Sequence, residues 1–111
     1  MINSIKKYVK EIYLEALYKK KGDKCAIFFP GFGFYQLNTS IPLFYKLLNK
    51  NFVCIRFEYP GIGCSKGKFN FWNAYKSFDL ILNFAKKIGR KIILIGLSLG
   101  AFVILKNLNE K

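Results

Sequence analysis

The fold of this chain is decided by residues 91–108, which read KIILIGLSLGAFVILKNL. The run Lys91–Ile95 is continuously apolar after its first residue and has the length of a strand that is buried on both faces. The pentapeptide at 96–100 follows at once, and the mostly apolar segment Ser98–Leu108 has the length of a helix. Because glycines begin and end the pentapeptide, it permits a sharp turn. The stretch therefore predicts a strand, a turn and a helix in immediate succession.

The same alternation of strand and helix occurs twice upstream. Apolar runs at Cys25–Phe29 and Phe52–Phe57 predict two more buried strands. Helical spacing of apolar residues follows each of them, over 42–50 and over Phe71–Ile88. Continuous apolar strands that alternate with helices indicate an α/β fold, with a parallel sheet that helices cover on both faces. We expect about three strands in this sheet.

The N-terminal segment Ile5–Leu17 also carries apolar residues at helical spacing, with lysines and glutamates between them. This pattern predicts an amphipathic helix. Residues 19–24, which include Gly22 and Asp23, predict the turn that leads into the first strand.

Composition bounds both the size and the chemistry of the protein. With 111 residues, of which 52% are hydrophobic and 23% charged, the chain predicts one globular domain, residues 1–111. It has no histidine, which excludes a histidine base and a histidine metal site within these residues. The three cysteines have no metal-ligand spacing, and two of them lie in the predicted strands. We therefore expect no metal, no cofactor and no disulfide framework.

The charge is strongly positive, with 19 basic and 6 acidic residues, or +13. Such a charge can indicate a nucleic acid or an anionic membrane as partner. Only Arg56 and Arg90 are arginines, however, and the lysines are scattered, whereas base and phosphate recognition favours arginine. We favour a solvated basic surface with no dedicated nucleic-acid partner. The sequence shows no signal peptide and no apolar stretch of membrane-spanning length, so we expect a cytoplasmic protein.

The pentapeptide Gly96–Gly100 matches the pattern G-x-S-x-G, and its position between a strand and a helix is that of a nucleophile elbow. Such a turn lifts the hydroxyl of Ser98 clear of the sheet, at the positive end of the helix. The alternative is a plain buried turn. A second match, Gly63–Gly67, lies in a polar loop with no strand or helix adjoining it, so Ser65 is interpreted as a loop residue.

Two glycine-containing loops follow the other predicted strands. In the first, Phe29–Phe34, glycines allow a backbone N–H to face the site, as an oxyanion hole requires. With the elbow in place, the donors would be the amides of Phe32 and Leu99; the alternative is a tight turn without a ligand. The second, Arg56–Gly67, fails as a phosphate-binding loop, because its glycine spacing is one residue too long for the P-loop and for the dinucleotide pattern.

Together the three motifs resemble those of the α/β-hydrolase superfamily. Pro30–Gly33 is similar to the family's oxyanion loop, with proline where histidine is usual. Arg56–Gly67 is similar to a loop of the serine aminopeptidases and small acyl hydrolases, and Gly96–Gly100 matches the elbow. The resemblance covers residues 24–108 and corresponds to the N-terminal half of the family's domain. It implies that the first predicted strand lies in the middle of the sheet.

The resemblance implies a serine hydrolase that cleaves an ester, thioester or amide through an acyl-enzyme, with Ser98 as nucleophile and the Phe32 and Leu99 amides as oxyanion donors. The family's acid and histidine follow the elbow in sequence, and eleven residues follow Gly100 here. Glu110 lies about three turns along the helix from the elbow, and no lysine lies close to Ser98 in sequence to act as base. We therefore expect a truncated, incomplete domain with little or no activity of its own.

The alternative is a non-catalytic α/β interaction module that retains the fold and associates with a complementary chain. In the family a further strand pairs with the one that leads into the elbow, so we expect Ile92–Ile95 to form an unpaired apolar edge. The expected partners are a small acyl substrate, if the site is completed, and either a complementary C-terminal fragment or a second copy of the chain. Alone, the chain should be marginally stable and should associate.

Overall fold

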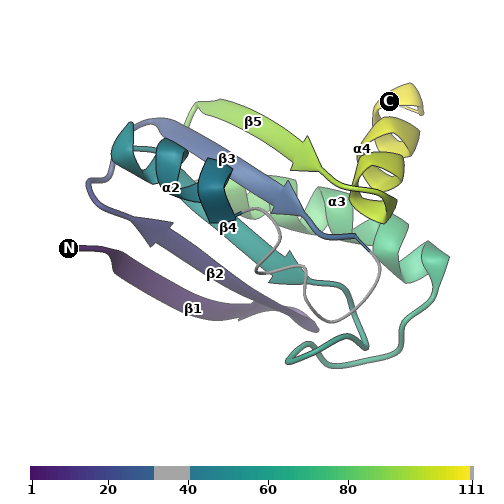
Figure 1. The fold of residues 1–111 in the computed structure, drawn as a ribbon. Coiled ribbons are helices and arrows are strands. Elements are labelled where there is room, and N and C mark those ends of the chain that lie inside the picture. Colours follow the sequence, from purple (N-terminus) through teal and green to yellow (C-terminus); the bar gives the residue numbers. More distant parts are fainter. Residues whose placement is uncertain (32–40, 111) are drawn as a thin grey trace.

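Three parallel strands form one side of the sheet. They are β3 (Lys24–Phe29), β4 (Val53–Glu58) and β5 (Lys91–Gly96), and β3 pairs with both of the others. The computed structural model describes residues 1–31 and 41–110, and Figure 1 shows their arrangement. The predicted strands and their order, with the first in the middle, are confirmed.

The sheet has two further strands, which form an N-terminal hairpin. β1 (Asn3–Val9) and β2 (Ile12–Tyr18) are antiparallel, and β2 also pairs antiparallel with β4. The sheet is therefore mixed and five-stranded, in the order β1-β2-β4-β3-β5, and the predicted helix over Ile5–Leu17 is wrong. The segment forms strands because β4 has an outer edge with unpaired backbone N–H and C=O groups, and β2 hydrogen bonds to them.

The periodicity of β2 is that of a strand with one buried face. Ile12, Leu14 and Ala16 are fully buried, whereas the residues between them are only partly so. The chain reverses at Lys10, which has a positive φ of 53°. Lysine gives no sequence signal for such a turn, since glycine and asparagine are the residues that usually adopt this conformation.

Helices cover the sheet on both faces, as predicted. α2 (Ile41–Asn49) lies on one face, where Phe44 and Leu48 pack against Phe28 and Cys54. α3 (Phe71–Lys86) and α4 (Leu99–Asn109) lie together on the other face and cover the larger core. The buried members of that core on the two helices are Ala74, Phe78, Ile81, Ala85, Val103 and Ile104.

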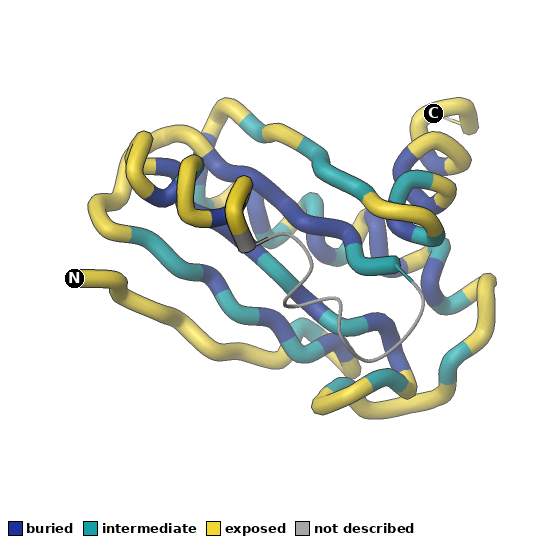
Figure 2. Tube along the Cα trace, in the orientation of Figure 1, coloured by how far each residue is buried: buried dark blue, intermediate teal, exposed yellow. Residues whose placement is uncertain are grey.

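Burial falls from the middle of the sheet toward its two edges (Figure 2). β3 is buried from Cys25 onward, β1 is almost entirely exposed, and every residue of β5 is exposed or half-buried. Within residues 1–31 and 41–110, no helix has the length and hydropathy needed to cross a membrane.

Candidate active site

Ser98 occupies a strained turn between β5 and α4. Its backbone has φ 54° and ψ −115°, which lies outside the regions that L-residues ordinarily adopt. Such a conformation costs about 1–3 kcal/mol and persists only where the surrounding structure imposes it. The predicted sharp turn at this serine is confirmed.

The two glycines of the elbow impose that turn through close backbone packing. An added Cβ at Gly96 would stand 2.6 Å from the amide nitrogen of Ala101. An added Cβ at Gly100 would stand 2.7 Å from the carbonyl carbon of Phe29 and would overlap its oxygen. Both distances are shorter than real Cβ contacts, so any side chain at either position would displace main chain. Only glycine lets β3, β5 and α4 meet this closely around Ser98.

The Ser98 hydroxyl is exposed and does not cap the helix that it precedes. A serine before a helix commonly accepts a hydrogen bond from an amide of the first turn, but here the side chain makes no such bond. No side chain in residues 1–31 and 41–110 hydrogen bonds to this hydroxyl either. The hydroxyl is thus presented outward at the carboxyl end of β5.

The start of α4 supplies a positive electrostatic environment. The amide of Gly100 donates to the carbonyl of Leu97 at 2.9 Å, and the amide of Phe102 donates to that of Ser98 at 3.1 Å. The amide of Leu99, the residue before Gly100, donates to no acceptor among the described residues, as is usual for the first residue of a helix. No acidic residue lies in the first turn. A negative charge that develops beside Ser98 is therefore favoured by the helix dipole and by the free Leu99 amide.

The loop after β3 approaches the same turn. An added Cβ at Gly31 would lie 3.6 Å from the Cβ of Ser98, so the two backbones are adjacent. Phe32, the other predicted oxyanion donor, lies outside the described residues.

Tyr59 fixes the beginning of this loop and was not identified from the sequence. Its hydroxyl donates to the carbonyl of Pro30 at 2.9 Å, and its ring is buried against Phe57. Burial raises the pKa of Tyr59 well above its usual value, so the phenol remains a donor. The only sequence signal was a tyrosine next to Pro60 at the end of a buried strand, which does not identify the distant partner.

The second G-x-S-x-G match is a structural loop, as predicted. Ser65 Oγ donates to the carbonyl of Glu58 and accepts from the amide of Tyr13 at 2.8 Å. The Glu58 carboxylate in turn accepts from the amide of Cys64 at 2.9 Å. Both hydrogen-bonding directions of the Ser65 hydroxyl are thereby used, and they tie the loop to β2 and β4.

The described residues do not supply the acid and base of a serine hydrolase. The chain has no histidine. Glu110 follows the last residue of α4, about 18 Å along the helix from Ser98, and faces Lys106 at 3.9 Å. The remaining carboxylates lie on other elements: Glu11, Glu15, Asp23, Glu58 and Asp79. Within the described residues, no three histidine, cysteine or acidic side chains group as metal ligands would.

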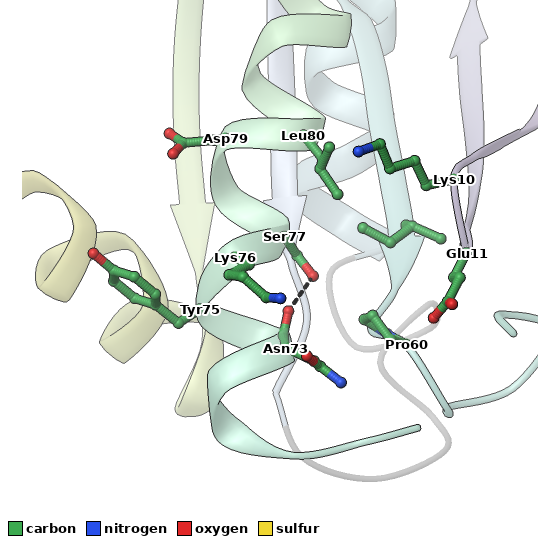
Figure 3. A pocket seen from close by; sticks show the side chains of 10 residues that line it. Lys10, Glu11, Pro60, Asn73, Tyr75, Lys76, Ser77, Asp79 and Leu80 are labelled. Atoms are coloured by element: carbon green, nitrogen blue, oxygen red, sulfur yellow. Dashed lines mark hydrogen bonds between the residues drawn. The ribbon is translucent and has the colours of Figure 1, made fainter. Parts of the chain in front are cut away.

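A pocket of about 520 Å³ lies away from the elbow, between the β1–β2 turn and α3 (Figure 3). Lys10 and Glu11 line one side of it, and Lys76 and Ser77 of α3 line the other. The Ser77 hydroxyl donates to the carbonyl of Asn73 at 2.9 Å and is fully buried. This serine is therefore engaged within its own helix and is not presented as a nucleophile.

The central parallel strands, the helices on both faces and the elbow at Ser98 define the class: the chain has the fold of the α/β hydrolases, over part of their length. The esterase Pf2001 of Pyrococcus furiosus superposes with a TM-score of 0.78 at 18% identity, over 99% of this chain and 47% of that one. An α/β serine hydrolase homologue from Coxiella burnetii gives 0.74 at 18% identity, over 98% and 58%. Est1E of Butyrivibrio proteoclasticus, with ferulic acid bound, gives 0.72 at 20% identity, over 91% and 45%.

The chain therefore spans about half the length of the solved structures that it matches. No protein-family model matches the sequence, and no curated protein does. At these identities the likeness is one of fold.

Proposed function

We propose that Ser98 is the nucleophile of an acyl hydrolase that acts on an ester, a thioester or an amide. The observation that carries the proposal is the backbone of Ser98, held at φ 54° and ψ −115° by two glycines that admit no side chain. Strain of this kind is concentrated at functional sites. The Ser98 hydroxyl makes no capping bond to its own helix, and the Leu99 amide, which donates to no acceptor among the described residues, can stabilise an oxyanion.

In this proposal a histidine base comes from polypeptide outside these 111 residues, because the chain itself has no histidine. A serine hydroxyl attacks an acyl carbon as its proton passes to a base, and the resulting oxyanion then collapses to the acyl-enzyme as the leaving group departs. In this account Ser98 supplies the attacking oxygen, and the Leu99 and Phe32 amides supply the oxyanion hole. The chain alone therefore has the serine nucleophile but lacks the base that would accept its proton.

The proposal is tested by supplying the missing base as free imidazole. The purified chain is treated with a fluorophosphonate probe, with and without imidazole, and the labelled serine is identified by mass spectrometry. We expect negligible labelling without imidazole, labelling of Ser98 that rises with imidazole concentration, and no such labelling in Ser98→Ala. No labelling of Ser98 at any imidazole concentration would overturn the proposal, whereas labelling that imidazole does not increase would show that the base lies within the chain.

A further inference from the structure

The start of α3 carries the two most exposed aromatic side chains of the described residues. Phe71 is 64% exposed and Trp72 is 63% exposed. Phe71 meets Phe69 edge to face, with 5.9 Å between the ring centroids, and Trp72 stacks on Tyr75 at 5.3 Å. Scattered exposed apolar residues are normal, whereas a contiguous exposed patch is typical of an interaction site. The adjacent rings therefore indicate a surface that binds a partner.

Hydrogen bonds fix the backbone beneath these rings. Asn70 Oδ1 accepts from the amide of Asn73 at 2.7 Å and so caps α3. The side-chain amide of Asn73 donates to the carbonyl of Lys68 at 2.8 Å. The rings are thus presented from a fixed helix start, so binding through them costs little conformational entropy.

Three lysines accompany the rings. Lys66, Lys68 and Lys76 are exposed, and the Lys76 ammonium lies over the Trp72 ring, 5.7 Å from its centroid. Together with the rings they form the basic-aromatic segment, residues 66–76. This combination is typical of proteins that bind an anionic membrane surface, because lysines are attracted to the lipid phosphates while aromatic rings enter the interface.

The segment itself carries no acidic side chain. Residues 59–78 contain no aspartate and no glutamate, so the three lysines give the segment a charge of +3. Two carboxylates border it: that of Glu11 lies against Gly67, and Asp79 follows on α3. Lys10, at the hairpin turn, lines the same pocket as both of these acids (Figure 3). The segment therefore presents positive charge and apolar rings together.

Aromatic rings with basic side chains also occur where proteins stack on the bases of single-stranded nucleic acid. Two observations favour a lipid surface here. Tyr75 already covers one face of the Trp72 ring, with 19° between the two planes. All cations of the segment are lysines, whereas nucleic-acid recognition favours arginine. A membrane surface requires only positive charge and exposed apolar bulk, and the segment presents both.

We propose that the basic-aromatic segment binds the surface of an anionic lipid membrane, with the rings of Phe71 and Trp72 in the interface and Lys66 and Lys68 at the lipid phosphates. The segment follows the carboxyl end of β4, and Ser98 follows the carboxyl end of β5. Because the two strands run in the same direction, both features lie at one end of the sheet (Figure 1). Binding would bring that end toward the lipid, but the proposal does not rest on the proposed function.

The test uses the fluorescence of Trp72, which is the only tryptophan of the chain and therefore reports on this segment alone. The purified full chain is titrated with vesicles of phosphatidylcholine, or of phosphatidylcholine and phosphatidylglycerol in equal amounts. With the anionic vesicles we expect the Trp72 emission to shift to shorter wavelength and to be quenched by lipids brominated in their acyl chains. With the neutral vesicles we expect neither change.

The apolar contribution is tested by Phe71→Ser, which should weaken binding to the anionic vesicles about tenfold, because one ring no longer enters the interface. Tyr45→Ser is the matched control, since Tyr45 is an aromatic residue 48% exposed on α2, on the other face of the sheet. It should leave the binding unchanged. Cooperative thermal unfolding of each variant verifies that it is folded.

The contribution of the lysines is tested by a pair of double variants that remove the same charge. Lys66→Gln with Lys68→Gln should weaken binding about tenfold. Lys86→Gln with Lys87→Gln changes two exposed lysines at the other end of α3, about 20 Å along the helix. This distance exceeds the range of screened charge interactions in physiological salt, so the second pair should have little effect.

Four outcomes would overturn the proposal. The first two are no shift of the Trp72 emission with anionic vesicles and an equal shift with neutral ones. The third is an equal effect of the two lysine pairs, which would show that the overall charge of +13 drives the binding. The fourth is a single-stranded oligonucleotide that shifts the emission at a lower phosphate concentration than the vesicles do. None of these results depends on the reactivity of Ser98, so this proposal and the proposed function can fail separately.

Discussion

The first turn of α4 rests directly on the last residue of β3, because the Cα of Gly100 lies against the carbonyl group of Phe29. This contact ties the helix after the elbow to the central strand of the sheet. It also sets the height at which Ser98 emerges, since Ser98 lies two residues before Gly100. The elbow is thus positioned by packing between main chains, with no side chain between them.

Gly100→Ala should therefore lower the free energy of unfolding by about 1–3 kcal/mol or more, because the new Cβ must displace main chain. Gly22→Ala is the matched control. A Cβ at Gly22 would meet only the carbonyl oxygen of Asn51, at an ordinary 3.5 Å, and no positive φ is involved. Its effect should stay within about 0.5 kcal/mol. Urea unfolding of both variants measures the difference, and equal stabilities would contradict the packing described for the elbow.

Ser98→Gly should raise the stability of the chain by about 1–2 kcal/mol, because glycine adopts the mirror-image extended region at little cost. Ser98→Ala keeps a Cβ at the same φ of 54°, so its stability should not rise in this way. Both variants lose the hydroxyl, so they differ in the strain and in the unfolded-state entropy of glycine, which opposes the gain. Thermal unfolding of the pair is the measurement. A glycine variant no more stable than the alanine variant would show that Ser98 stores no strain.

The stability of the chain should decrease as the pH rises above about 9, because two thiols are buried in the sheet. Burial raises the pKa of Cys25 and of Cys54 to about 12, from 9.0. Each thiol stays neutral in the fold while it ionises in the unfolded chain, so its contribution is complete below pH 9 and is lost between pH 9 and 12. The slope should be on the order of 1 kcal/mol per pH unit for each thiol.

The free energy of unfolding, measured by urea unfolding at several pH values, tests this slope, and the exposed Cys64 provides the control. Cys64→Ser should leave the pH slope unchanged, whereas Cys25→Ala and Cys54→Ala should each reduce it. A thiol reagent at pH 8 should modify Cys64 rapidly and the two buried thiols only on unfolding. Equal rates at all three cysteines would contradict the burial described for β3 and β4.

The purified chain should associate when salt screens its charge. Exposed apolar side chains lie on β5, the elbow and α4, namely Ile93, Leu97, Phe102, Leu105 and Leu108, and the net charge of +13 opposes contact between copies. Sedimentation velocity should show larger and more heterogeneous species at high salt. Leu105→Lys should reduce this association, and Ile5→Lys should not. A monodisperse monomer that melts cooperatively at low and high salt would contradict an unpartnered face, and a defined dimer would favour a second copy as its partner.

The part of the fold that sequence predicts is the part whose elements are buried on both faces or bounded by glycine. β3 and β4 are short buried apolar runs, β5 is an apolar run at the edge that ends at Gly96, and the turn at Ser98 is set by Gly96 and Gly100. In each case a local pattern permits one arrangement only. The strand order followed from the same alternation together with the resemblance to a known fold.

The N-terminal hairpin could not be predicted in this way, because its apolar residues fit the spacing of a helix as well as that of a strand. Within Ile5–Leu17 apolar residues recur at helical spacing, and Ile12, Leu14 and Ala16 also alternate as in a strand. The choice depends on tertiary structure: β4 needs a neighbour, and Glu15 meets Arg56 across the strands at 3.0 Å. The hydrogen bond from Tyr59 to the Pro30 carbonyl could not be predicted either, because only the folded sheet brings these two residues together.

The central claim, that the elbow makes Ser98 a nucleophile, is tested most directly inside a single sample. Ser65 lies in the same five-residue pattern, but its hydroxyl is committed to Glu58 and Tyr13. The measurement is the ratio of fluorophosphonate label on Ser98 to that on Ser65 in the imidazole-treated chain, by site-resolved mass spectrometry. We predict label on Ser98 at least tenfold above that on Ser65. Equal labelling of the two serines would show that the strained turn confers no reactivity and would contradict the assignment of Ser98.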